Sequence, residues 1–136
     1  MFQLDVRLAK DTLTLVSWPL CDVQLMNDSQ FPWLILVPRV EGVTELYHLD
    51  KAQREQLDAE SILLGETLMS LFKGDKLNVA ALGNVVSQLH IHHVVRYKRD
   101  LVWPAPVWGK CSAKAYSGLE LEALTLKLSA LINHVW

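Results

Sequence analysis

Five short segments of the chain carry either the apolar–polar alternation or the short continuous apolar run of a β-strand. The run from Trp33 to Val37 is apolar throughout and ends at Pro38, which suits a strand buried on both faces. Connections between the strands are mostly short, whereas parallel pairing needs a long crossover. We therefore expect an antiparallel sheet built from residues 12–17, 21–26, 33–37, 77–82 and 88–97.

Two longer segments repeat their leucines at the spacing of an amphipathic helix. The first is predicted over residues 51–73, where Asp50 begins a capping box and Gly74 can provide a left-handed stop. The second begins near Ser117, with Glu120 three residues later as a second capping box. Strands, a long helix, further strands and a C-terminal helix, in that order, predict an α+β fold.

The composition is that of one globular domain. The chain has 136 residues, 51% of them hydrophobic, which is enough to bury a core without disulfides or metals. A formal net charge of -2 gives no electrostatic footprint for nucleic acid or an anionic membrane. No apolar run approaches the roughly 18 residues of a membrane span. We expect a single domain over residues 1–136, with no nucleic-acid and no membrane partner.

The two cysteines, Cys21 and Cys111, are too far apart in sequence to suggest a disulfide framework or a zinc ribbon. Two reduced thiols in a cytosolic protein are the simpler interpretation. The N-terminal residues MFQLDVRLAKD lack the basic start and long apolar stretch of a signal peptide. The expected location is therefore the cytoplasm.

The last predicted strand carries three polar side chains on one face. Side chains alternate between faces along residues 88–93 (QLHIHH), so Gln88, His90 and His92 lie together and His93 points away. A neutral imidazole is a good nucleophile toward phosphorus, and a reference pKa of about 6.5 leaves much of it neutral at cytosolic pH. His92 can donate a hydrogen bond to a phosphate oxygen, and Gln88 offers an amide donor.

The His-x-His spacing by itself leaves three interpretations open: phosphate chemistry, metal ligation, or a structural role, which is the commonest. A zinc site built from His90, His92 and a cysteine lacks convincing further ligands at standard spacing. No metal site is therefore predicted.

The segment QLHIHHVV resembles the signature of the histidine-triad (HIT) family, His-φ-His-φ-His-φ-φ, in which φ is apolar. LILVPR (34–39) resembles the strand with Pro-Lys/Arg of that family, and a long helix and another strand then lead through Gly83-Asn84 to the triad. The resemblance covers roughly residues 21–108, and NVAALGN and WPAPVWG are similar to a bacterial subgroup of HIT-domain hydrolases. It implies a HIT-like fold: about five antiparallel strands, a long helix after the third and a C-terminal helix.

This resemblance implies an activity. His90 matches the central histidine, the nucleophile that forms a nucleotidyl-histidine intermediate, and His92 matches the last histidine, which contacts phosphate. The implied enzyme is a hydrolase or transferase acting at the α-phosphate of a dinucleoside polyphosphate, such as diadenosine tetraphosphate, or of a nucleoside phosphoramidate. No cofactor is required. The alternative is a nucleotide-binding protein with little or no turnover. Because relatives form two-fold dimers with joined sheets, a homodimer is also implied.

Two positions depart from the family pattern. Gln88 stands where the first histidine is normally found, and an amide can orient or donate but cannot take up or give a proton. Trp33 stands near the site where many members carry another active-site histidine. Both departures remove a titratable group, and both favour the low-turnover alternative.

Three further residues are candidates for nucleotide binding. Asn27 and Asp28 lie at the end of a strand where the family places a ribose-binding carboxylate or amide, and a turn role is equally open for each. Asn84 lies in a region where family members use a polar residue to contact phosphate, or it forms a turn.

The end of the triad strand and the loop after it hold other possible contacts. Arg96 and Lys98 could meet distal phosphates or form a solvated strand end. Trp103 and Trp108 could stack on a base or cover an interface.

Overall fold

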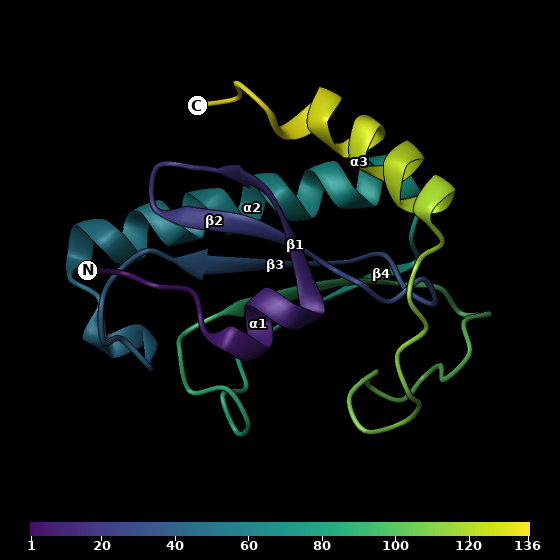
Figure 1. The fold of residues 1–136 in the computed structure, drawn as a ribbon, viewed down its shortest axis with the longest axis horizontal. Coiled ribbons are helices and arrows are strands. Elements are labelled where there is room, and N and C mark those ends of the chain that lie inside the picture. Colours follow the sequence, from purple (N-terminus) through teal and green to yellow (C-terminus); the bar gives the residue numbers. More distant parts are fainter.

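The structure is a computed structural model that describes residues 1–136 (Figure 1). In chain order the elements are α1 (Val6–Asp11), β1 (Thr12–Ser17), β2 (Cys21–Met26), β3 (Trp33–Pro38), the 3₁₀ helix η1 (Leu46–His48), α2 (Lys51–Phe72), β4 (Lys76–Ala80), β5 (Ile91–Arg96) and α3 (Gly118–Ile132). The strands form one antiparallel sheet in the order β1-β2-β3-β5-β4. The expected α+β class and five-stranded antiparallel sheet are confirmed. None of the helices combines the length and apolarity needed to span a bilayer.

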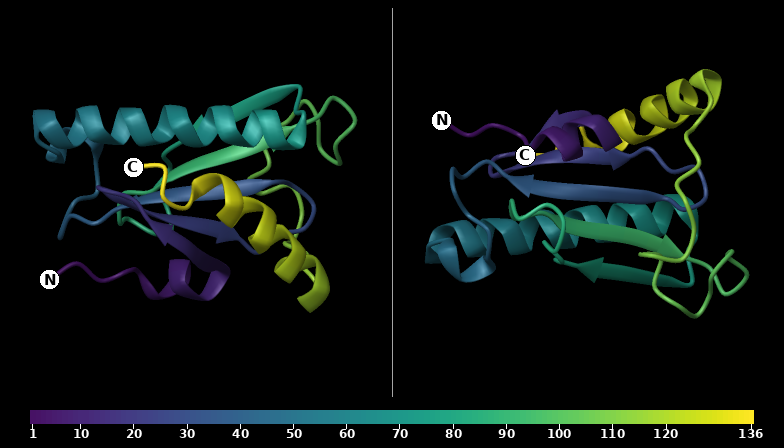
Figure 2. Two further views of the ribbon diagram at one scale, coloured as in Figure 1. Left: turned by 90° about the horizontal axis from the view of Figure 1, so that it is seen from above. Right: turned by 60° about the horizontal axis from the view of Figure 1, so that its bottom comes forward.

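The two faces of the sheet are covered by different parts of the chain (Figure 2). Leu34 and Leu36 of β3 belong to the core formed with α2 and α3. Ile35 and Val37 belong to the opposite core, formed with α1 and the loop that follows β5. Every residue of β3 is buried, as its continuous apolar run predicted. Alternation along a strand therefore decides which of the two covered faces a side chain meets.

The helix ends follow the capping signals with one correction. Asp50 and Gln53 exchange the two hydrogen bonds of a capping box at the start of α2, and Ser117 begins α3 in the same way. The prediction that Gly74 forms the left-handed stop of α2 is wrong, because Lys73 adopts that conformation with φ 53°. Gly74 has a different reason to be glycine: a Cβ there would lie 2.4 Å from Val95 Cγ1.

Two differences at the ends of predicted elements affect the site. The predicted strand 88–97 is shorter, because β5 begins only at Ile91. Before that point the chain leaves β3, and the Leu89 N–H donates to the Val43 carbonyl instead. The six-residue helix α1 was not predicted, since so short a helix shows no apolar periodicity, although Asp5 caps it by accepting from the Arg7 N–H.

Both cysteines are free thiols, with Cys21 buried in the core and Cys111 exposed. The backbone N–H groups of Leu20 and Cys21 donate to the buried carboxylate of Glu60 in α2, each at 2.9 Å. Glu60 therefore ties the turn between β1 and β2 to the long helix, and its burial is compensated by these amide donors.

Arg96 is neither a solvated strand end nor a free cation for distal phosphates, so both expectations for it are wrong. Its side chain is 1% exposed and forms two hydrogen bonds to Asp100, at 2.8 and 3.0 Å, and a third to Asn78. The rings of Phe31 and Trp103 lie against its guanidinium. Burial alone would raise the pKa of Asp100, but the hydrogen bonds from Arg96 and the backbone outweigh it and lower that pKa. The pair fixes the start of the loop after β5.

Replacing Asp100 by alanine is expected to destabilise the fold by about 3–5 kcal/mol, because it leaves the Arg96 guanidinium buried without a counter-charge. The free energy of unfolding in urea measures this loss. Asp58→Ala on the exposed face of α2 is the control and is expected to change stability by less than about 0.5 kcal/mol. Equal effects of the two substitutions would contradict this account of Arg96.

Candidate active site

A cavity of about 420 Å³ opens beside His90 and His92, on the face of the sheet that α1 covers. This volume lies within the range of about 300–1,000 Å³ that is typical of small-molecule sites. The lining consists of Arg7, Leu8, Asp11, Met26, Leu82, Gly83, Asn84, Val85, Val86, His90, His92, Trp108 and Gly109.

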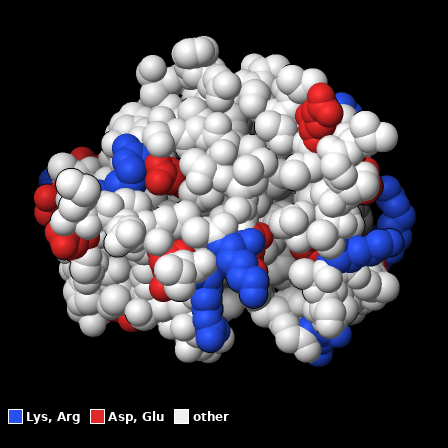
Figure 3. Space-filling model, in the orientation of Figure 1, with Lys and Arg blue, Asp and Glu red and all other residues white.

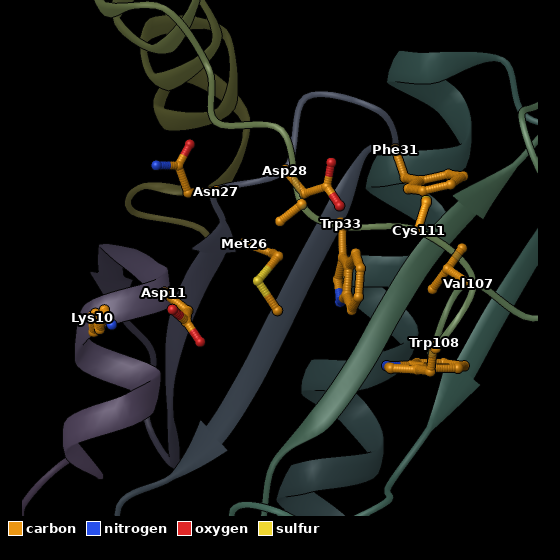
Figure 4. A pocket seen from close by; sticks show the side chains of 12 residues that line it. Lys10, Asp11, Met26, Asn27, Asp28, Phe31, Trp33, Val107, Trp108 and Cys111 are labelled. Carbon is orange, nitrogen blue, oxygen red and sulfur yellow. The ribbon is translucent and has the colours of Figure 1, made fainter.

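A second hollow, of about 320 Å³, adjoins this cavity and shares Asp11, Met26, Trp108 and Gly109 with it. Figure 4 shows α1 on one side of the second hollow and the aromatic side chains of Trp33 and Trp108 on the other. Together the two hollows form a continuous cleft that runs from the histidines to the end of β2.

His90 is held in one tautomer by the backbone. Its Nδ1 lies 2.7 Å from the carbonyl oxygen of Gln88, and a carbonyl oxygen can only accept. Nδ1 therefore carries the hydrogen, and Nε2 of the neutral ring carries a free lone pair. His90 is 6% exposed and lines the cavity, so its ring lies at the cavity wall and largely out of bulk water.

His92 is held in the matching tautomer by Trp33. The indole Nε1–H of Trp33 donates to Nδ1 of His92 at 3.0 Å, and an indole N–H can only donate. The lone pair of His92 is therefore on Nδ1, and the hydrogen is on Nε2. The rings of His90 and His92 meet edge to face with 4.8 Å between centroids, so the two residues line the cavity as direct neighbours.

His92 is a neutral donor at physiological pH. Burial lowers its pKa to about 3, and the neighbouring His90 and His93 rings act in the same direction. His93 points to the other face of the sheet, as the alternation predicted, and its Nε2 accepts from the hydroxyl of Ser61 in α2 at 2.8 Å. Burial also lowers the pKa of His93, to about 4. The two adjacent histidines therefore have separate surroundings.

Gln88 differs from the expectation that it shares a cavity wall with His90 and His92. Its side-chain oxygen accepts from the Asp5 N–H and its amide donates to the Gln3 carbonyl, both at 2.9 Å. It is absent from the lining of the cavity. The carboxamide of Gln88 thus fastens the N-terminal segment just before α1, while its backbone carbonyl orients His90.

The three nucleotide-binding candidates all line the cleft. Asn84 borders the cavity of the histidines, and Asn27 and Asp28 border the adjoining hollow. Asn27 also accepts from the Tyr116 N–H at 2.9 Å, and Asp28 accepts from the backbone and side chain of Gln30, both at 3.0 Å. Asn27 and Asp28 therefore have the turn-forming contacts that the sequence left open as well as a place at the cleft.

The sequence matches a known protein family. A model of the HIT domain family matches residues 7–99, more than half of the chain. The chain belongs to the HIT domain family. No curated protein matches it in sequence.

Three solved bacterial structures resemble the chain over nearly its whole length. A histidine triad protein from Marinobacter aquaeolei VT8 is 51% identical, with a TM-score of 0.97, and the match covers 100% of this chain and 99% of the other. A histidine triad protein from Bradyrhizobium japonicum is 39% identical, with a TM-score of 0.94, covering 96% and 98%. A histidine triad (HIT) protein from Sinorhizobium meliloti 1021 is 35% identical, with a TM-score of 0.93, covering 96% and 97%.

Several residues of this HIT cleft have no sequence signature. Arg7 and Asp11 come from the short helix α1, and Lys10 on the same helix borders the adjoining hollow. Figure 3 shows basic side chains gathered over α1, in the lower middle of this face, with further charged side chains along its left and right edges. Nothing in the sequence could have found these three residues, because the helix that carries them shows no apolar periodicity and only the fold brings it to the histidines.

The indole nitrogen of Trp108 is buried and has no hydrogen-bond partner within the protein. The ring itself packs edge to face on His92 and on Trp33, with centroid separations of 5.2 and 5.9 Å. Of the two tryptophans proposed for base stacking or an interface, Trp108 therefore lies in the cleft, whereas Trp103 packs on Arg96. No group of three or more His, Cys, Asp or Glu side chains is arranged to hold a metal ion.

The low pKa values of His92 and His93 predict a loss of stability in mild acid. Both pKa values are about 3–4 in the folded state and near 6.5 in the unfolded chain, so the unfolded state binds more protons below pH 6.5. Between pH 6 and pH 5 each group is expected to reduce the free energy of unfolding by about 1 kcal/mol.

His93→Gln removes one of these groups on the face that α2 covers. The free energy of unfolding of this variant is expected to fall by about 1 kcal/mol less than that of the wild type between pH 6 and pH 5. Urea unfolding at several pH values compares the two proteins. Parallel curves for the wild type and the variant would show that His93 is not held neutral in the folded state.

Proposed function

We propose that this HIT protein is a nucleotide hydrolase or nucleotidyl transferase that acts at the α-phosphate of a dinucleoside polyphosphate or a nucleoside phosphoramidate. The observation that carries the proposal is the tautomer of His90. The Gln88 carbonyl holds Nδ1–H, which leaves the Nε2 lone pair at the wall of a nucleotide-sized cavity.

The proposed reaction splits one displacement at phosphorus into two. In the first, Nε2 of His90 forms a bond to the α-phosphorus and the bond to the leaving group breaks, which gives a nucleotidyl-histidine. In the second, water attacks the same phosphorus, the electron pair of the N–P bond returns to Nε2 and a proton passes to solvent. His92 Nε2–H stabilises negative charge on the phosphate oxygens in both steps.

The rest of the cleft is suited to the remainder of a nucleotide. Arg7 supplies positive charge in the cavity of the histidines and Lys10 in the adjoining hollow, since neither side chain forms an ion pair within the protein. Asn84 lies beside the histidines as a second phosphate contact. Asn27 and Asp28 offer amide and carboxylate groups to ribose hydroxyls in the adjoining hollow.

His90→Asn tests the nucleophile. The variant is expected to lose turnover of diadenosine tetraphosphate by at least about a thousandfold, because no other group in the cavity presents a free imidazole lone pair. It is also expected to keep binding nucleotide, since the rest of the cleft is unchanged. Rapid quench in alkaline denaturant, followed by mass spectrometry at alkaline pH where a P–N bond survives, should find an adenylyl group on His90 in the wild type and none in the variant.

His134→Asn is the matched control for this test. His134 is exposed, lies at the C-terminal end and has φ 60°, a conformation that asparagine tolerates well. The control is expected to turn over substrate at the wild-type rate. An adduct that persists in His90→Asn, or wild-type turnover by that variant, would remove His90 as the nucleophile.

The alternative function is nucleotide binding with little or no turnover, and the position of Gln88 favours it. Gln88 replaces a family histidine and its side chain is used in holding the N-terminal segment. The same experiment separates the two functions. Tight nucleotide binding with neither product nor adduct would support the alternative.

A homodimer belongs to the same proposal. Strand β4 is an edge of the sheet, and Val79 on it and Ile62 on α2 are about half exposed. With Leu77 and Met69 they line a shallow apolar hollow on this side of the molecule. An exposed apolar strand edge favours pairing with a second strand, and a two-fold axis there would join two sheets.

Val79→Glu is expected to break this dimer, because two carboxylates would face each other across the joined edge. Size-exclusion chromatography with light scattering should give twice the 15.4 kDa chain mass for the wild type and the single mass for the variant. Leu119→Glu, at an 82% exposed leucine on α3, is the control and should stay dimeric. A monomeric wild type at micromolar concentration would contradict the interface.

A further inference from the structure

Trp33 holds its place beside His92 through the register of the sheet. β3 and β5 pair so that Trp33 lies opposite Val94 and Ile35 lies opposite His92. Trp33 and His92 are therefore diagonal neighbours on the same face, a separation that a long aromatic side chain can bridge. The indole is 7% exposed, and its N–H reaches Nδ1 of His92 at 3.0 Å.

This hydrogen bond limits what His92 can do with protons. A neutral imidazole gives up its Nε2 proton readily only if Nδ1 takes up another, as in a relay between two rings. Nδ1 of His92 already accepts from an indole N–H, which neither titrates nor accepts. His92 can therefore donate a hydrogen bond through Nε2, but it has no partner from which to replace a proton.

The other groups of the cavity do not replace the missing acid. The titratable or charged side chains that line it, besides the two histidines, are Arg7 and Asp11. A guanidinium does not deprotonate in proteins, and an ionised carboxylate only accepts. Lys10, Asp28 and Cys111 line only the adjoining hollow, and Gln88 carries an amide that does not titrate.

We propose that Trp33 makes the site selective for leaving groups that depart without taking up a proton, that is, for phosphoric anhydrides over phosphoramidates. This inference rests on the proposed function and narrows its substrate class. Trp33 acts as a positioning residue, through His92, and does not itself contact the reacting atoms.

Phosphoric anhydrides and phosphoramidates differ in whether the leaving group must take up a proton. When the Nε2 lone pair of His90 attacks an anhydride, the P–O bond to the bridging oxygen breaks and its electron pair leaves on a phosphate. A phosphate oxygen holds that charge easily, because the second pKa of a phosphate monoester is about 6. In a phosphoramidate the electron pair would leave on nitrogen. An alkylamine, with a pKa near 10.4 for its conjugate acid, departs only after nitrogen has been protonated.

Two substrates with the same adenylyl group test the inference. Diadenosine tetraphosphate and an N-alkyl adenosine 5′-phosphoramidate give the same adenylyl-His90, so the ratio of their kcat/KM values reports substrate binding and the first displacement, and not the shared hydrolysis step. The wild type is expected to favour the anhydride by at least about a hundredfold, the lower range of what a general acid contributes. Trp33→His places a ring that can pass a proton beside His92 and is expected to narrow that ratio by raising phosphoramidate turnover.

Trp33→Phe keeps a buried aromatic ring but removes the N–H together with part of the indole. Nitrogen-15 NMR of the histidine rings should show His92 as a single Nε2–H tautomer in the wild type and a loss of that fixed state in Trp33→Phe. This readout does not depend on activity, and a purely structural role of Trp33 would not move it. An unchanged His92 signal in Trp33→Phe would overturn the inference.

The possible failures are distinguishable. If the wild type cleaves both substrates at comparable kcat/KM, or prefers the phosphoramidate, the proposed function stands and the inference about Trp33 alone is overturned. If neither substrate forms an adduct on His90, the proposed function fails and the inference fails with it.

Discussion

The pairing of β3 with β5 is the interaction on which the candidate site depends. It buries both strands completely and sets, residue by residue, which side chains meet on the face that α1 covers. A shift of one residue would turn His92 and Trp33 to opposite faces, because strand side chains alternate. Sheet register places the Trp33 indole N–H against Nδ1 of His92, which puts the hydrogen of that ring on Nε2. Just before β5, the Gln88 carbonyl holds the hydrogen of His90 on Nδ1.

Around this rigid strand pair, the cleft is closed by parts of the chain that are distant in sequence. Helix α1 forms one wall, the turn at 82–86 a second, and the loop after β5 a third. Each wall has its own attachment: Gln88 holds the N-terminal segment, and the buried Arg96–Asp100 pair holds the start of the loop. The basic side chains suited to a phosphate thus lie on α1, which packs on the sheet but is not part of it.

Much of the fold could be predicted from the sequence because its signals are local. Alternation placed His90 and His92 apart from His93, and capping boxes placed the starts of both long helices. The rest depends on contacts between distant residues. No local sequence pattern shows that the Gln88 side chain binds Gln3 and Asp5 or that Arg96 pairs with Asp100 in the interior. None shows that α1 lines the same cavity as the histidines. The family motif predicted candidate residues, and the structure places His90 and His92 at the cavity, but the motif did not show that the Gln88 side chain binds the N-terminal segment instead.

The attachment of the first residues has a practical consequence for handling the protein. The segment before α1 is fastened by the two hydrogen bonds of Gln88, by the packing of Phe2 and Leu4 on the core, and by an exposed contact between the Met1 ammonium and Glu41. An affinity tag joined ahead of Met1 would abolish the last of these and pull on the chain that leads into α1, which borders the cleft. A tag placed after Trp136, on the opposite side of the sheet, would leave that border undisturbed.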